Sequence, residues 1–193
     1  MRTNPERRQV MLDAAIEILA RDGARGLTFR AVDTQAEVPK GTASNYFANR
    51  DDLLTQVGSR FYERLAPDAP TLAEMSAGPH NRAAVIELLT GTVDRITSFR
   101  TGYLAQLELR LEATRRPELQ HMLTDRVRAD IDFNIRNHLD SGQPGDANSV
   151  LLLYLALNWL VVERLTLPEI FDEEQARELI RIAAERAIPT DSE

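Results

Sequence analysis

The sequence predicts an all-α fold in which a small N-terminal helical head is joined to a larger helical body, with about nine helices in total. Three observations indicate this class. Apolar residues recur three or four positions apart along almost the whole chain, which is the spacing of one helix face. No segment alternates apolar and polar residues with the period of two expected of a half-buried strand. Prolines, glycines and capping residues separate the apolar stripes, so each stripe is expected to form its own helix.

The first predicted helix covers residues 6–21. Its apolar positions have the i, i+3, i+4, i+7, i+8 spacing of a helix that packs one face on a core. Gly23 follows this helix, and glycine readily adopts the left-handed conformation that often ends a helix. We expect this helix to brace its neighbours rather than to contact a ligand. The apolar positions are Met11, Ala14, Ala15, Ile18 and Leu19.

Residues 28–50 predict two short helices joined by a tight turn. Thr28 can cap the first helix, because its hydroxyl oxygen can accept from a backbone N–H that lacks a partner within the helix. Val38 and Pro39 interrupt the pattern, since proline disfavours the helical conformation of the residue before it and is tolerated at the start of a new helix. The second helix is expected over residues 40–48.

The second of these helices has an unusual surface of short side chains. A helix that enters the DNA major groove, which is about 12 Å wide, needs small polar side chains that reach base edges. It also needs a cation, and Lys40 is the only lysine of the chain. Helix, turn and small polar helix together predict a helix-turn-helix. The short side chains belong to Gly41, Thr42, Ala43, Ser44 and Asn45.

The rest of the chain predicts six more helices. Asn49 is a cap for the first of them, and residues 67–78 have the composition of a loop. Asp172 and Gln175 have the spacing of a capping box before the last helix. The six helices are expected at approximately residues 50–65, 79–99, 103–114, 117–139, 146–165 and 173–187.

Composition and charge narrow the class of protein. The 193 residues carry a formal net charge of −7 and no cysteine, so disulfides and thiolate metal sites are excluded. Residues 1–60 have nine basic and eight acidic side chains, whereas the remainder is strongly acidic. A near-neutral head is compatible with DNA binding if its cations share one face. We expect no signal peptide and no membrane span, since the longest apolar run covers only residues 150–157. A cytoplasmic location follows.

Over about its first 55 residues the sequence resembles the tetracycline-repressor (TetR) family of dimeric transcriptional regulators. The family pattern is a helix ending in glycine, followed by conserved positions at fixed spacing through the helix-turn-helix. Three positions depart from it: Asp33 replaces alanine, Glu37 replaces the turn glycine, and Ser44 replaces tyrosine. The matching residues are Gly23, Thr28, Val32, Ala36, Val38, Pro39, Gly41, Thr42, Tyr46, Phe47, Asn49, Arg50 and Leu53.

The resemblance implies a DNA-binding surface and a division of labour along the chain. Residues 1–50 would form the helix-turn-helix domain, and residues 51–193 the effector-binding and dimerisation domain. The family's base-facing positions correspond to Lys40, Thr42, Ser44 and Asn45. Its phosphate-contacting positions correspond to Thr28, Arg30, Tyr46 and Arg50. For Tyr46 the alternative is packing against the core.

The predicted helix over residues 146–165 is apolar almost all round, which suggests either a central core helix or self-association. The resemblance implies that the last two helices form a homodimer interface. Two recognition helices about 34 Å apart would then read a pseudo-palindromic operator in double-stranded DNA.

The resemblance also implies a small effector molecule that releases the DNA, bound among the middle helices. Polar or aromatic residues within apolar helices are candidate contacts, or else structural residues with internal partners. The sequence indicates no cofactor and does not identify the effector. The candidates are Gln106, Arg110, Asn158 and Trp159.

The sequence can be compared with two other classes of function. An enzyme is not expected, because His80, His121 and His138 are scattered without metal-ligand spacing and no phosphate-binding loop is present. The second alternative is a helical dimeric protein-interaction module with a degenerate helix-turn-helix, for which the departures at Asp33 and Glu37 leave room. Members of the family usually repress transcription, so repression is the expected sign of regulation.

Overall fold

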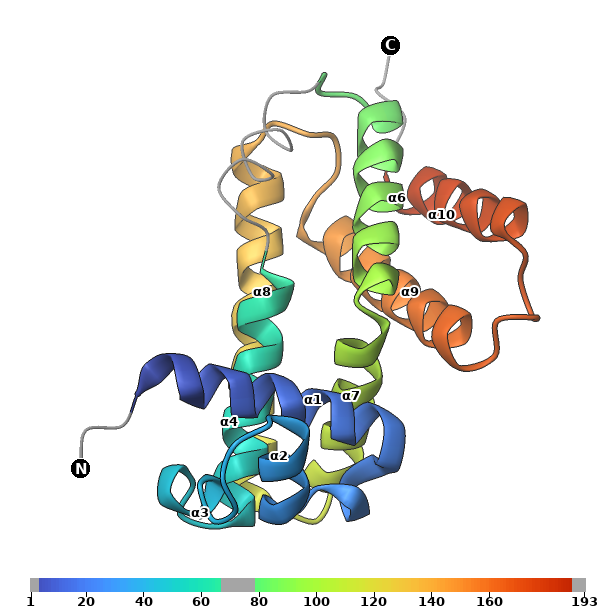
Figure 1. The fold of residues 1–193 in the computed structure, drawn as a ribbon. Helices are drawn as coiled ribbons and strands as arrows, with labels where there is room; N and C mark the ends of the chain where they lie inside the picture. Colours follow the sequence, from blue (N-terminus) through green and yellow to red (C-terminus); the bar gives the residue numbers. More distant parts are fainter. Residues whose placement is uncertain (1–3, 67–78, 189–193) are drawn as a thin grey trace. The chain divides into compact units, whose positions relative to one another are not determined.

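A computed structural model describes residues 4–66 and 79–188 of the chain. In these residues the regular structure is helical without a strand, which confirms the predicted all-α class. The predicted loop at residues 67–78 lies outside the described residues. The helices are α1 (Pro5–Gly26), α2 (Phe29–Gln35), α3 (Ala43–Tyr46), α4 (Arg50–Leu65), α6 (Arg82–Ser98), α7 (Arg100–Ala113), α8 (Pro117–Asp140), α9 (Ala147–Thr166) and α10 (Glu173–Ala187) (Figure 1).

The chain divides into two compact units. The first unit consists of Met1–Ala66 and Phe99–Arg126, and so contains α1 to α4, α7 and the first part of α8. The second consists of Pro67–Ser98 and Val127–Glu193, and contains α6, the rest of α8, α9 and α10. The division predicted at residue 50 is a functional one, between DNA binding and effector binding, and it stays a prediction.

The core of the first unit is built around α1, which packs most extensively along α7 and also contacts α2 and α4. The apolar face predicted for the first helix is confirmed, because all five of its residues are buried. Burying one such large apolar side chain contributes roughly 1.5–3 kcal/mol. This core holds α2 and α3 against α1 and α4. Its largest members are Met11, Ile16, Ile18, Leu19, Leu27, Phe47, Leu53, Leu54, Leu109 and Leu119.

The end of α1 contains a kink at Gly23. This glycine has φ 66° and ψ −176°. Its φ is positive as predicted, but its ψ is far from the value of about +47° in the left-handed helical conformation, so the predicted left-handed cap is wrong. The helix was expected to stop there, but helical structure continues to Gly26. The backbone N–H of Ala24 donates to the Glu108 carboxylate of α7 at 3.1 Å, so the interruption at Gly23 leaves this group with a partner.

In the second unit α6, α9 and α10 pack against one another (Figure 1). Their shared core contains Val85, Leu153, Ala184 and Ile188. The capping box predicted at Asp172 is confirmed, since its side chain accepts from the Gln175 N–H and the Gln175 side chain accepts from the Asp172 N–H. A second capping box, formed by Asp146 and Ser149, begins α9.

Helix α9 does not bury all of its apolar surface within the chain. Leu153, Leu157 and Leu160 are buried, whereas other large apolar side chains lie in solvent. By length and composition alone this 20-residue helix could cross a membrane, because its apolar stretch resumes after Asn158. A core or interface helix of a soluble protein passes the same test. The exposed side chains are Leu152 (59%), Leu155 (65%) and Trp159 (65%).

Candidate nucleic-acid interface

Residues 28–49, the helix-turn-helix segment, form two short helices joined by a turn. The predicted cap of α2 is confirmed: the Thr28 hydroxyl accepts from the Ala31 N–H at 3.1 Å. Glu37, which stands where the family has glycine, has φ 53°. A non-glycine residue in this left-handed region costs roughly 1–2 kcal/mol, so the turn is made at some expense in stability. The predicted turn is confirmed.

The predicted extent of the second helix is wrong. It was expected to begin at Lys40, but α3 begins at Ala43 and ends at Tyr46. Pro39 therefore does not open a helix, and its carbonyl oxygen accepts from the Thr42 N–H at 3.1 Å in a turn. Gly41 has φ 86°, which no right-handed helix contains. Lys40 and Thr42 are thus presented by a turn rather than by a helix.

Asp33 explains why this turn is stable. Its side chain is only 2% exposed, and its two oxygens accept from the backbone N–H groups of Gly41 at 2.6 Å and Ala43 at 2.7 Å. Short hydrogen bonds to an ionised acceptor are stronger than neutral ones. A buried carboxylate needs hydrogen-bond partners, and the sequence did not reveal that two backbone N–H groups supply them here.

The short polar side chains of this region fold back onto the chain. Ser44 Oγ and Asn45 Nδ2 both donate to the Gly41 carbonyl oxygen, at 2.8 and 3.1 Å. Thr42 Oγ1 donates to the Pro39 carbonyl oxygen at 2.5 Å. Lys40, Ser44 and Asn45 are exposed, and Thr42 is half-buried. These four residues lie together within seven positions and present a narrow, hydrogen-bonding edge.

The predicted phosphate contacts fall into two groups. Thr28 and Arg30 are exposed at the start of α2. Tyr46 is half-buried, packs against the core of the first unit, and accepts at its hydroxyl from the Asn4 N–H at 3.2 Å. The packing alternative raised for Tyr46 therefore describes its ring, while its hydroxyl remains near the molecular surface. Arg8 fixes the same end of α3 by donating to the Tyr46 carbonyl oxygen at 3.1 Å.

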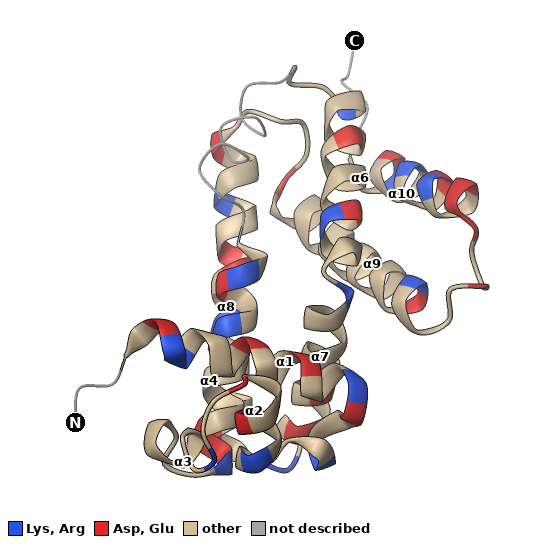
Figure 2. Ribbon diagram, in the orientation of Figure 1, with Lys and Arg blue, Asp and Glu red and all other residues tan. Residues whose placement is uncertain are grey.

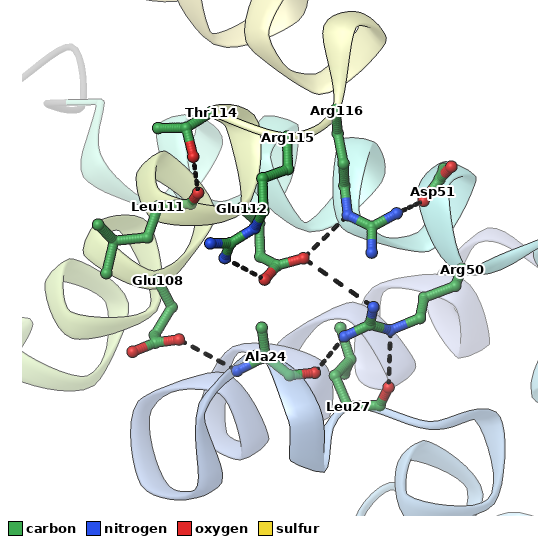
Figure 3. A network of polar contacts seen from close by, with 10 residues as sticks. All are labelled: Ala24, Leu27, Arg50, Asp51, Glu108, Leu111, Glu112, Thr114, Arg115 and Arg116. Carbon is green, nitrogen blue, oxygen red and sulfur yellow. Dashed lines mark hydrogen bonds and ion pairs between the residues drawn. The ribbon is translucent and has the colours of Figure 1, made fainter.

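Arg50 contacts both α1 and α7. Its guanidinium donates to the carbonyl oxygens of Ala24 and Leu27, the latter at 3.4 Å, and lies 4.0 Å from the Glu112 carboxylate (Figure 3). The Arg50 side chain is still 39% exposed, so part of its guanidinium remains accessible to a phosphate. Arg50 thus links α4 to the end of α1 in this conformation.

The candidate effector residues are divided between the two units. In the first unit Gln106 is buried and donates to the Tyr62 hydroxyl at 3.4 Å, whereas Arg110 is exposed. In the second unit Asn158 donates to the Tyr154 carbonyl oxygen at 2.8 Å, so the alternative of a partnered structural residue describes it, and Trp159 is exposed. Burial raises the pKa of Tyr103, which is on α7 with Gln106, to about 12.

The charges of the helices are mixed rather than of one sign. Figure 2 shows Lys or Arg beside Asp or Glu on most of them. Several of the cations are neutralised by neighbours, such as Arg60, which pairs with Asp13 at 2.9 Å. Exposed cations of the helix-turn-helix segment are Arg30 and Lys40. Among the described residues no group of three or more acidic or histidine side chains is arranged to hold a metal ion.

Two short helices, a tight turn and an exposed edge of small polar side chains define a helix-turn-helix protein of the DNA-binding type. Residues 11–57 match the description "Bacterial regulatory proteins, tetR family", and residues 80–190 match "Tetracyclin repressor-like, C-terminal domain". The second match covers more than half of the chain. The chain therefore belongs to the TetR family of DNA-binding transcriptional regulators.

Curated relatives match parts of the chain. An uncharacterised transcriptional regulator of Xanthobacter autotrophicus is 34% identical over 79 residues, which is 41% of this chain and 39% of that protein. The nicotine-responsive repressor HdnoR of Paenarthrobacter nicotinovorans is 26% identical over 112 residues, 58% of this chain and 57% of that protein. These alignments thus span about two fifths to three fifths of the relatives' lengths.

Solved structures match nearly the whole chain. A TetR-family member from Streptomyces coelicolor A3 is 28% identical with a TM-score of 0.71, covering 96% of this chain and 100% of that one. The multidrug-binding protein EbrR in complex with imidazole is 27% identical with a TM-score of 0.64, covering 98% of each chain. EbrR has also been solved with ethidium.

Proposed function

We propose that this protein is a dimeric transcriptional repressor that binds a pseudo-palindromic operator and leaves it when a small effector binds. The observation that carries the proposal is the exposed polar edge at residues 40–46, held in place by the buried Asp33 carboxylate. The relatives add support, because HdnoR is a repressor that responds to nicotine. A cytoplasmic location follows from a role on genomic DNA.

The base-reading residues of this proposal are Lys40, Thr42, Ser44 and Asn45. Lysine donates to guanine O6 and N7, asparagine pairs bidentately with adenine, and hydroxyl groups suit several bases. The Ser44 and Asn45 side chains share one carbonyl acceptor, so their remaining donor and acceptor positions are available to a base. Thr28, Arg30 and the Tyr46 hydroxyl are proposed to contact phosphates. Arg50 keeps its proposed phosphate contact, because its side chain is 39% exposed, and its hydrogen bonds to the Ala24 and Leu27 carbonyl oxygens hold it at the end of α1.

A homodimer through α9 and α10 supports this function in two ways. It would cover the exposed apolar side chains Leu152, Leu155 and Trp159 of α9, and Leu179 and Ile182 of α10. Leu152, Leu155 and Trp159 have the spacing of one helix face, and a group of exposed large apolar side chains is typical of an interaction site. Two chains also supply two recognition edges, and one short edge alone contacts too few base pairs to select a site in a genome.

The effector proposal rests on the family and on EbrR, which binds ethidium and imidazole. We propose that Gln106 and Arg110 of the first unit, and Asn158 and Trp159 of the second, are the positions to test. Gln106 and Asn158 have a structural alternative in their internal hydrogen bonds, and Trp159 has one in its place on the proposed dimer face. The chemical class of the effector is left to the test.

The test is selection of duplexes from a random pool by the purified full-length protein at low salt, followed by footprinting of the recovered duplex. We expect a preferred sequence with two-fold symmetry and a complex that contains two chains. Recovery of no preferred duplex would contradict the proposal. It would favour the alternative of a helical dimeric protein-interaction module. Repeating the footprint with a panel of small cationic and aromatic molecules then tests release by an effector.

A further inference from the structure

Three arginines converge on one carboxylate in the first unit (Figure 3). Glu112, near the end of α7, accepts from Arg115 at 3.0 Å and from Arg116 at 2.9 Å, and the Arg50 guanidinium lies 4.0 Å away. The Glu112 side chain is only 13% exposed, and among the three arginines Arg116 is the least exposed, so solvent screens the Glu112–Arg116 pair least. The hydrogen bond from Arg116 keeps the pKa of Glu112 below its ordinary value, although burial acts in the opposite direction.

The residues around Glu112 contact the chain on both sides of the helix-turn-helix segment. On the N-terminal side, Arg50 donates to the carbonyl oxygens of Ala24 and Leu27, and Leu27 directly precedes the Thr28 cap. On the C-terminal side, Arg116 pairs with Asp51 in the first turn of α4. The segment is therefore held at the residues where it begins and at those where it ends.

Glu108 adds a third contact one helical turn before Glu112. Side chains four residues apart lie on the same helix face, so α7 presents both carboxylates toward the end of α1. Glu108 accepts from the Ala24 N–H at 3.1 Å. Two features of Gly23 favour glycine at this position. Its φ is 66°, which side chains rarely adopt, and a Cβ there would lie 3.3 Å from Glu108 Oε2. The kink in α1 and the position of α7 are thus matched to each other.

We propose that Glu108, Glu112 and Arg116 form a clasp that positions the helix-turn-helix segment, and that operator discrimination depends on it. This inference rests on the proposed function. Reading bases requires side chains placed to within about 0.5 Å, which a segment with a loose end does not achieve. The clasp residues touch no DNA in this proposal. They are positioning residues that act through Ala24, Leu27, Arg50 and Asp51.

The opposing interpretation is that these contacts only stabilise the fold. The two interpretations predict different DNA affinities for the variants. Loss of stability lowers the amount of active protein, so binding to every duplex falls by the same factor. Loss of positioning lowers affinity for the operator, whereas affinity for unrelated DNA, which depends on phosphate neutralisation, is retained.

The first test is the ratio of the dissociation constants for a scrambled duplex and for the selected operator, measured with full-length protein. In Glu112→Gln and in Arg116→Gln the ratio is expected to fall about tenfold, within the usual range of coupling between sites. In the double variant the ratio is expected to fall little further, because both changes break the contact between Glu112 and Arg116. Glu118→Gln is the matched control: Glu118 is exposed in the first turn of α8, at the same corner, and has no ion pair with a described residue.

The second test needs no DNA. Hydrogen exchange of the Ala24 amide is expected to be faster in Glu108→Ala than in the unchanged protein, with exchange in α10 unaltered. If the unchanged protein prefers no duplex, the proposed function fails, and exchange alone then decides whether the clasp holds Ala24. If the unchanged protein discriminates and both Glu112→Gln and Arg116→Gln keep its ratio, the clasp proposal is overturned and the proposed function stands.

Discussion

Helix α9 of the second unit and the helix-turn-helix segment of the first unit differ in which kinds of side chain they expose and bury. In α9, Leu155 and Trp159 are each 65% exposed although both are apolar. In the helix-turn-helix segment, Asp33 is buried although it is charged, and backbone N–H groups bind both of its oxygens. The contrast indicates what each region needs. The segment needs an exact backbone conformation, whereas α9 needs a second apolar surface.

The largest expected effect comes from placing charges on the exposed face of α9. Leu155→Glu combined with Trp159→Glu is expected to convert the dimer to monomers, since burying each original side chain is worth roughly 1.5–3 kcal/mol. Operator affinity should fall about a hundredfold or more, because one recognition edge remains per particle. Light scattering and duplex titration measure both effects. Val10→Glu, at an exposed apolar position of α1, is the control, and a stable dimer in the α9 double variant would remove this interface.

The second largest effect is expected at Asp33 in the helix-turn-helix segment. Asp33→Ala leaves the N–H groups of Gly41 and Ala43 without their acceptor, which should lower the free energy of unfolding by about 2–4 kcal/mol. Operator binding should fall as well, because α3 loses its anchor. Asp33→Asn retains one acceptor and should lose less. Urea unfolding measures the series, with Asp22→Asn as a surface control. Equal stability of all three variants would show that Asp33 does not hold the turn.

A smaller effect tests the strain of the turn. Glu37 and Gly41 both have a positive φ, of 53° and 86°. A positive φ is unfavourable for glutamate and is readily adopted by glycine. Glu37→Gly is expected to raise the free energy of unfolding by up to about 1 kcal/mol, and Gly41→Ala to lower it by about 1–2 kcal/mol. A Cβ at Gly41 would meet no atom within 4 Å, so the change reports backbone strain alone. Changes of the same sign in both variants would contradict this account.

The smallest effect is the pH dependence of the clasp. Its charged neighbours keep the pKa of Glu112 below its ordinary value, and the hydrogen bond from Arg116 is the largest cause. A carboxylate with a lowered pKa contributes stability that is present above its unfolded pKa and is lost as the pH falls through the folded pKa. Glu112→Gln should therefore lose stability at neutral pH and differ less from the unchanged protein below about pH 4. Parallel curves between pH 7 and 3 would exclude this contribution.

The positions of the helices could be predicted because local patterns determine them. The Thr28 cap, the Asp172–Gln175 capping box and the apolar face of α1 depend on neighbours within one or two turns, and each was predicted correctly. The start of α3 was not. Its position depends on Asp33, which lies eight and ten residues before the two N–H groups that it binds.

The long-range contacts of the candidate site could not be predicted for the same reason. Arg50 matched a family position for phosphate contact, but its partners Ala24 and Glu112 are far away in the sequence. Nothing near Glu108 in the sequence indicates that it binds the Ala24 amide, 84 residues away. The sequence predicted an interruption of the first helix at Gly23, whereas the partner of the Ala24 amide depends on how α7 packs along α1.

The central claim is that residues 40–46 read duplex DNA, and the most direct measurement is the operator affinity of Lys40→Ala. The dissociation constant for the selected operator is expected to rise about 5- to 150-fold, while that for a scrambled duplex changes only by the loss of one charge. An operator dissociation constant equal to that of the unchanged protein would contradict the account.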